Sequence, residues 1–131
     1  MIFAVAIGNL DIHAKNFSIL HLPDESISLA PAYDQVALRH NSKDGRMALS
    51  LGGEYIHANI SMKNIVSELV SWQCRSFSDK NEVNDFAIRC LKSYKDAMDS
   101  IIPNKKAYKG LKNDINSFIS NLIDGKNTSN M

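Results

Sequence analysis

The stretch GNLDIHAKNFSIL, residues 8–20, places an Asp, a His, a Lys and an Asn between two apolar runs. The run IFAVAI at 2–7 predicts the end of a helix, and FSIL at 17–20 predicts the start of a strand. Residues 9–16 are therefore expected to form a loop between two buried elements. Catalytic side chains concentrate in loops that a rigid scaffold holds in this way.

A simpler interpretation is that the polar side chains of this loop have only local roles. Asn9, Asp11 and Asn16 could each bond to nearby backbone groups, as Asx side chains often do in turns and caps. Their occurrence together in one short loop favours a functional site.

The composition is that of a globular domain, with 131 residues, 44% hydrophobic content and a formal charge of +1. This charge gives no reason to expect direct nucleic-acid binding or attachment to an anionic membrane. Residues 1–60 carry four basic and six acidic side chains, a net charge of −2, which suits a cation site. The opening apolar run is too short to span a bilayer and lacks a signal-peptide pattern, so we expect a cytoplasmic protein.

The apolar pattern changes from short strands to helices between residues 56 and 60. Two strands at 17–20 and 27–30 flank turn residues and predict a hairpin, and a third strand is expected at 47–51 before two glycines. The sequence predicts a mainly helical α+β fold. We expect one domain over 1–124, divided into a loop and hairpin segment (1–56) and a helical subdomain (57–124), with a flexible tail at 125–131.

Three amphipathic helices are expected after residue 60. Ser61 begins the first, Asp79 with Glu82 begins the second, and the third runs from Leu111 to Ile123. Pro103 should stop the second helix and Gly125 the third. The apolar residues of these helices are expected to pack in the core, and the following are assigned to it or to nearby packing: Ile65, Val66, Leu69, Val70, Trp72, Phe77, Phe86, Cys90, Tyr94 and Met98. Cys74 and Cys90 are expected to stay reduced.

One functional interpretation is a metal-dependent phosphoesterase, because Asp11 and His13 form the D-x-H with which metallophosphoesterases begin. A two-metal site needs further carboxylate, Asn and His ligands from downstream segments, which this sequence lacks. Its four histidines are also not spaced as pairs that a helix would bring onto one metal. This interpretation is disfavoured.

Phosphoryl transfer fits the pattern better. It requires an acid that orients or accepts the proton of a hydroxyl, an amide oxygen for Mg²⁺, and a second carboxylate for the same ion. Asp11 and Asn16 have the D-x-x-x-x-N spacing of a kinase catalytic loop, and Asp34 follows the expected hairpin in the segment LAPAYD.

These motifs resemble a known family. The pattern GN-x-D-x-H-x-KNFS at 8–18, followed by LAPAYD at 29–34, closely resembles the C-terminal lobe of HipA-like serine/threonine kinases, a family that includes toxins of bacterial type II toxin–antitoxin pairs. MALSLGGE at 47–54 is similar to the strand and turn that follow in the family. The resemblance implies a protein-kinase-like C-terminal lobe whose helical remainder is the family's helical subdomain.

The resemblance also implies roles for individual residues. Asp11 corresponds to the catalytic base, and Asn16 and Asp34 correspond to the Mg²⁺ ligands of an ATP-dependent kinase. His13 and Lys15 correspond to loop residues near substrate or phosphate, although His13 could instead brace the loop through a backbone hydrogen bond. Hard oxygen ligands of this kind are the ones that Mg²⁺ prefers.

A kinase also needs a Gly-rich loop and a strand Lys over the nucleotide phosphates, and the six glycines of this sequence form no such loop. We therefore expect the chain to be a C-terminal lobe alone, either a truncated product or one piece of a split kinase, that works when joined to its missing N-terminal lobe. Alone it should bind Mg-ATP weakly or not at all. The alternative is a catalytically silent remnant or interaction module. A protein substrate and a DNA-binding antitoxin are the other partners that the family resemblance implies.

Overall fold

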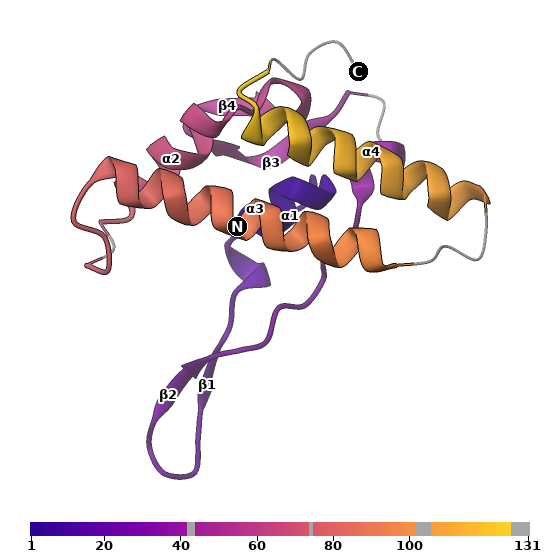
Figure 1. Cartoon of the computed structure of the whole chain (residues 1–131). Coiled ribbons are helices and arrows are strands. Elements are labelled where there is room, and N and C mark those ends of the chain that lie inside the picture. Colours follow the sequence, from indigo (N-terminus) through magenta and orange to yellow (C-terminus); the bar gives the residue numbers. More distant parts are fainter. Residues whose placement is uncertain (42–43, 74, 102–105, 127–131) are drawn as a thin grey trace.

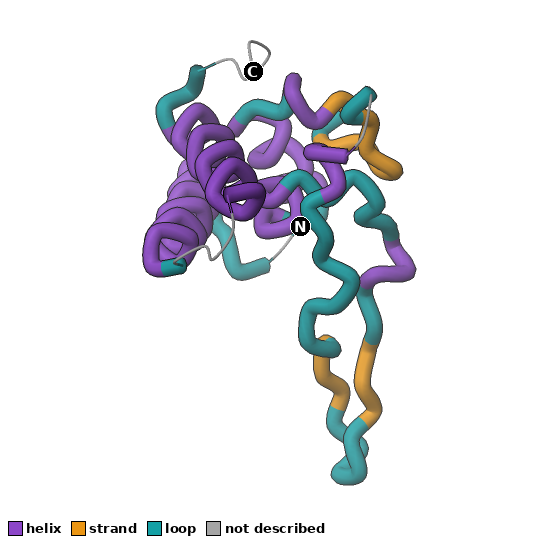
Figure 2. Tube along the Cα trace, turned by 90° about the vertical axis from the view of Figure 1, so that its right-hand side faces the viewer, coloured by secondary structure: helices purple, strands orange, loops and turns teal. Residues whose placement is uncertain are grey.

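The computed structural model of the chain describes residues 1–41, 44–73, 75–101 and 106–126. A helical body carries a β-hairpin that projects away from it (Figures 1 and 2). The elements are α1 (Ile2–Ile7), β1 (Ile19–His21), β2 (Ile27–Leu29), β3 (Arg46–Leu51), β4 (Glu54–Ile56), α2 (Met62–Ser71), α3 (Lys80–Ser100) and α4 (Lys106–Ile123), with short 3₁₀ turns at Ala14–Asn16, Leu38–Asn41 and His57–Asn59. The predicted α+β class is confirmed, with strands before residue 57 and three helices after it.

The first helix ends where the sequence predicts. Gly8 adopts a left-handed conformation with φ of +72°, which glycine tolerates and which ends α1. The N–H of Asn9 then donates to the carbonyl oxygen of Ala4 at 2.8 Å. A Cβ at position 8 would lie 2.8 Å from the Cβ of Arg39, so this glycine also permits a close approach between two segments. The chain therefore enters the polar loop in a fixed direction.

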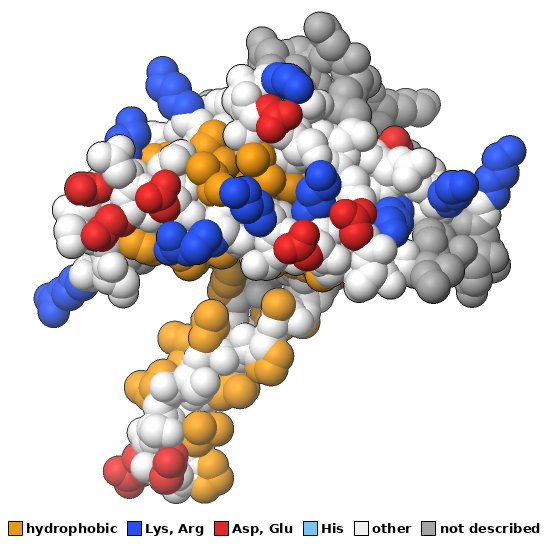
Figure 3. Space-filling model, in the orientation of Figure 1, with side chains coloured by type: hydrophobic (Ala, Val, Ile, Leu, Met, Phe, Trp, Pro, Cys, Tyr) orange, Lys and Arg blue, Asp and Glu red, His pale blue; other side chains and the backbone are white. Residues whose placement is uncertain are grey.

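The first hairpin lies outside the core. Its strands pair antiparallel, with Ile19 opposite Leu29 and His21 opposite Ile27, so these four side chains share one face. Ile19, Ile27 and Leu29 are 63–67% exposed. Figure 3 shows apolar side chains along the hairpin and acidic ones at its tip. The predicted hairpin is thus confirmed, but its first strand begins at Ile19 instead of residue 17, and neither strand buries any of its residues.

The second hairpin contains a strand that the sequence reading missed. Leu51 pairs with Glu54, so Gly52 and Gly53 form a two-residue turn in which both φ angles are positive. A Cβ on Gly52 would also lie 2.7 Å from the carbonyl oxygen of Asn64 in α2. The glycine pair therefore provides both a tight turn and a close approach between β3 and α2.

α2 and α3 begin at the predicted caps, whereas α4 begins at Lys106, five residues before the predicted Leu111. Asp79 accepts hydrogen bonds from the N–H groups of Asn81 and Glu82 at 2.6 and 3.0 Å, and Ser61 precedes α2. α3 packs against the three other helices (Figure 1). The buried apolar residues of α2, α3 and α4 are Ile65, Val66, Leu69, Val83, Ala87, Leu91, Ile115, Phe118, Ile119 and Leu122. The side chains of Phe77, Phe86, Cys90, Tyr94 and Met98 pack against this core.

Two packing assignments on α2 are wrong. Val70 is 44% exposed because it lies at the edge of the stripe formed by Ile65, Val66 and Leu69. Trp72 is 49% exposed; it follows the helix as its C-cap residue, and its indole N–H donates to the carboxylate of Glu68. Cys90 is a free thiol. Cys74, Pro103 and residues 127–131 of the expected tail lie outside the described residues. Among the described helices, none combines the length and apolarity that a membrane span needs.

His57 connects the second hairpin, α1 and α4 inside the core. Its Nε2 donates to the carbonyl oxygen of Val5 at 2.6 Å, and its ring stacks on Phe118 with the centroids 4.3 Å apart. The guanidinium of Arg39 lies 5.4 Å from the centre of the same Phe118 ring. This cluster fixes the helix that leads into the polar loop.

Candidate functional site

The polar loop is closed by its own side chains. Ala14–Asn16 forms one 3₁₀ turn, and the amide oxygen of Asn16 accepts a hydrogen bond from the backbone N–H of His13 at 2.8 Å. Asn16 is buried, whereas Asp11 and Lys15 are exposed. Asn16 therefore does bond to a nearby backbone group, as the simpler interpretation of the loop predicts.

The same Asn16 amide also makes a distant contact. Its Nδ2 donates to Oδ2 of Asp34 at 3.0 Å, which joins two predicted metal ligands that lie 18 residues apart in sequence. Asp34 has φ of +56°, a left-handed conformation that Asp adopts more readily than most residues. The structure thus brings Asn16 and Asp34 together.

Asn9 fixes the backbone on both sides of this pair. The side chain is 1% exposed; its Oδ1 accepts from the N–H of Asp11, and its Nδ2 donates to the backbone oxygen of Asp34, both at 3.1 Å. One buried amide therefore positions the predicted base and a predicted metal ligand at once. Asn9 is a positioning residue.

Backbone bonds and one tyrosine hold the loop to the rest of the molecule. The N–H of Ala48 in β3 donates to the oxygen of Leu10 at 2.7 Å. The hydroxyl of Tyr33 donates to the oxygen of Lys15 and lies near Oγ of Ser18, both at 2.7 Å. These contacts attach the loop to β3 and to the base of the hairpin.

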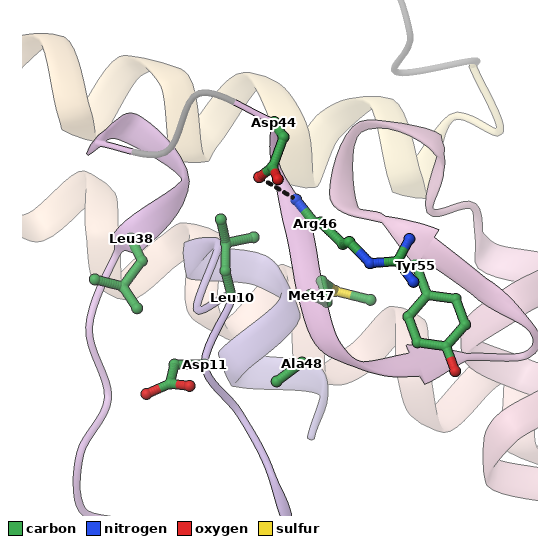
Figure 4. A pocket seen from close by; sticks show the side chains of 8 residues that line it. All are labelled: Leu10, Asp11, Leu38, Asp44, Arg46, Met47, Ala48 and Tyr55. Atoms are coloured by element: carbon green, nitrogen blue, oxygen red, sulfur yellow. Dashed lines mark hydrogen bonds between the residues drawn. The ribbon is translucent and has the colours of Figure 1, made fainter.

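Asp11 opens onto a pocket of about 630 Å³ (Figure 4). The pocket is lined by Leu10, Asp11, Leu38, Asp44, Arg46, Met47, Ala48 and Tyr55. The carboxylate of Asp11 makes no hydrogen bond to any residue that the structure describes. Its backbone is fixed by Asn9 while its side chain faces solvent, an arrangement that leaves the carboxylate available to an incoming hydroxyl.

Asn16 lines a different pocket, of about 200 Å³, on the side of the hairpin base. The lining of this pocket includes Asn16, Phe17, Pro31 and Gln35 but not Asp11. The loop therefore separates the predicted base, on one side, from a predicted metal ligand on the other.

The side chains of the remaining two predicted residues, His13 and Lys15, contact no common partner among the described residues. His13 is partly buried and contributes its backbone N–H to the loop; its Nδ1 is buried and has no hydrogen-bond partner among the described residues. Lys15 is exposed; its backbone oxygen accepts from Tyr33, and its ammonium group has no hydrogen bond to a residue that the structure describes. Their assignment to substrate or phosphate stays a prediction.

The oxygen atoms at Asn16 and Asp34 suit a hard cation. Oδ1 of Asp34 accepts no hydrogen bond from the described residues, and the amide oxygen of Asn16 has a second lone pair besides the one that His13 uses. In the described part of the chain, no group of three or more His, Cys, Asp or Glu side chains could hold a metal. Two protein ligands are nevertheless typical where nucleotide phosphates and water complete the coordination of Mg²⁺.

Sequence reasoning missed three residues of this region. Asn9 was considered only as a turn residue, although its partner Asp34 lies 25 residues away. Arg46 and Tyr55 had no assigned role, and they form one wall of the Asp11 pocket. Only the unpredicted strand β4 brings Tyr55 beside β3.

The chain belongs to the HipA-like C-terminal domain family, whose model matches residues 1–102. This match covers well over half of the chain and confirms the family that the loop motifs indicated. Comparisons with curated proteins and with solved structures found no match.

Proposed function

We propose that this chain is the C-terminal lobe of a serine/threonine protein kinase, which transfers a phosphoryl group from ATP to a protein hydroxyl when an N-terminal lobe completes it. The observation that carries the proposal is the hydrogen bond between Asn16 and Asp34, beside a loop that presents Asp11 on its other side. Family membership supports it.

In the proposed reaction, the acceptor hydroxyl enters the pocket at Asp11. Its oxygen forms a bond to the γ-phosphorus while the bond to the bridging oxygen breaks, which releases ADP; the hydroxyl proton passes to the Asp11 carboxylate. Asn9 contributes by holding the backbone of Asp11 and Asp34 in fixed positions, which is the positioning that phosphoryl transfer depends on.

Asn16 and Asp34 would hold Mg²⁺, and the bound ion would neutralise the charge on the phosphate oxygens. The hydrogen bond from Asn16 to Asp34 keeps the two side chains adjacent without a cation. Residues outside these 131 must supply the Gly-rich loop and the lysine that clamp the nucleotide.

The test is a completed kinase, made by joining this chain to the N-terminal lobe of a relative in the family. Asp11→Asn should lower ATP-dependent phosphorylation at least about 100-fold because the variant keeps the shape but removes the base. Asn16→Ala and Asp34→Ala should also abolish turnover, and raised Mg²⁺ should partly restore only Asn16→Ala. Asp85→Asn, an exposed carboxylate on α3, is the matched control and should change nothing.

A second candidate function is an interaction module without catalysis. The exposed apolar face of the first hairpin favours it, since contiguous exposed apolar surface marks binding sites. A completed kinase that binds ATP but never phosphorylates would support this candidate. One that phosphorylates equally well with Asp11→Asn would instead contradict the role of Asp11 as base.

A further inference from the structure

The Asp11 pocket contains an arginine that the proposed reaction does not use. The guanidinium of Arg46 lies over the ring of Tyr55, 4.5 Å from its centre, and Figure 4 shows the side chain extending from β3 toward that ring. No carboxylate among the described residues forms a salt bridge with it. The Asp44 carboxylate is instead bonded to the backbone N–H of Arg46 at 3.1 Å.

The ring of Tyr55 leaves the binding edge of the guanidinium accessible. An arginine that lies over an aromatic ring still has N–H donors at the edge of its guanidinium, in a fork that matches a carboxylate. The contact with the ring also limits the rotamers of the arginine, so less conformational freedom is lost when an anion binds. Arg46 is exposed and Tyr55 is 39% exposed, so an incoming chain can reach both.

The strand geometry sets the separation between Arg46 and the proposed base. The bond from Ala48 to Leu10 places these residues side by side, and Asp11 follows Leu10 directly. Arg46 precedes Ala48 by two residues and shares its face of β3, about 7 Å away. An extended polypeptide advances about 3.3–3.6 Å per residue, so a chain that places a hydroxyl at Asp11 would present a residue two to four positions away to Arg46.

Between these two ends the side chains that line the pocket are apolar: Leu10, Met47 and Ala48 (Figure 4). Met47 is buried against the core, and Asp44 also lines the pocket. We propose that this pocket selects acceptor segments with an acidic side chain two to four residues from the phosphorylated Ser or Thr, a proposal that rests on the proposed phosphoryl transfer. The guanidinium of Arg46, held over the ring of Tyr55, binds that carboxylate. Arg46 is a specificity-determining residue.

The test measures binding, so it does not depend on catalysis. Two synthetic peptides that differ only in one residue, Ser-Leu-Leu-Glu and Ser-Leu-Leu-Gln within an alanine and glycine context, are titrated into the ¹⁵N-labelled chain. A second pair carries the Glu or Gln before the Ser. For at least one pair, the acidic peptide should bind more tightly by up to about fivefold, the upper end of what an exposed charge pair contributes. The side chain of Arg46 and the backbone of Tyr55 should shift.

Three variants test whether the preference for the acidic peptide depends on Arg46. Arg46→Gln should abolish the difference between the peptides, and Arg46→Lys should keep part of it because the charge remains while the fork is lost. Arg89→Gln removes the same charge from the exposed face of α3 and should leave the preference intact. Equal binding of both members in both pairs, or a preference that survives Arg46→Gln, would overturn the proposal. Neither result would alter the effect of Asp11→Asn in the completed kinase, so the two proposals fail separately.

Discussion

Asn9 offers the sharpest test of how the site is built. Asn9→Ala removes two hydrogen bonds and leaves the N–H of Asp11 and the oxygen of Asp34 without those partners. Each bond is worth about 1 kcal/mol, and each group left unsatisfied in a buried place costs about 1–3 kcal/mol. Because one of the two groups can turn to water, we expect a loss of about 2–4 kcal/mol in the free energy of unfolding. That loss would lower Tm by on the order of 10 °C.

Asn9→Asp tests the two hydrogen bonds of the Asn9 side chain separately. This variant keeps an oxygen that can accept from Asp11, but it places a second oxygen where Nδ2 now donates to Asp34 at 3.1 Å. It should therefore be at least as destabilising as Asn9→Ala, since it adds a buried charge. Asn113→Ala, at an exposed position of α4, is the matched control and should be neutral or slightly stabilising.

Urea unfolding followed by circular dichroism measures these differences. A change below about 0.5 kcal/mol for Asn9→Ala, the range of ordinary surface substitutions, would refute the positioning role. A stable Asn9→Asp variant would show that the amide nitrogen does not hold Asp34.

Three further predictions concern the scaffold. Gly52→Ala should cost about 2 kcal/mol or more by urea unfolding, because it adds a clash with the α2 backbone to the strain of a positive φ, whereas Gly53→Ala adds strain alone and should cost about 1 kcal/mol. Phe118→Ala should cost about 3–5 kcal/mol in the same assay, and an undisturbed variant would mean that α4 is not part of the core. Hydrogen bonds from the Ser26 hydroxyl, the larger cause, and from the Ser26 N–H hold the pKa of Asp24 below its ordinary value of 3.8. The ionised carboxylate therefore stabilises the turn above pH 3.8, and this stabilisation is lost as the pH falls through the lowered pKa. An NMR titration in which Ser26→Ala leaves the Asp24 pKa unchanged would contradict the cause given.

The sequence contains enough local information to place most elements. The helix stop at Gly8, the cap at Asp79 and the change of period after residue 56 each act within a few residues, so pattern reading recovers them. The strand β4 was missed because three residues carry too little pattern, although two adjacent glycines are a known signal of a hairpin turn.

The candidate site was only partly predictable for a physical reason. The spacing of Asp11, Asn16 and Asp34 led to the predicted chemistry, and the structure joins Asn16 to Asp34 by a hydrogen bond. The role of Asn9 depends on a bond across 25 residues, and the pairing of Arg46 with Tyr55 depends on the register of β3 and β4. Neither of these two long-range contacts produces a periodic pattern in the sequence from which it could be predicted.

The central claim is that Asn16 and Asp34 form one cation site on the side of the loop opposite Asp11, and Mn²⁺ tests it directly on the chain itself. Mn²⁺ accepts the oxygen ligands that suit Mg²⁺, and its unpaired electrons broaden nearby NMR signals. At low Mn²⁺ the side-chain amide of Asn16 and the backbone of Asp34 should broaden first, and excess Mg²⁺ should reverse the effect. Asp34→Ala should remove it. Broadening that begins at other exposed carboxylates, or that is unchanged by Asp34→Ala, would contradict the account.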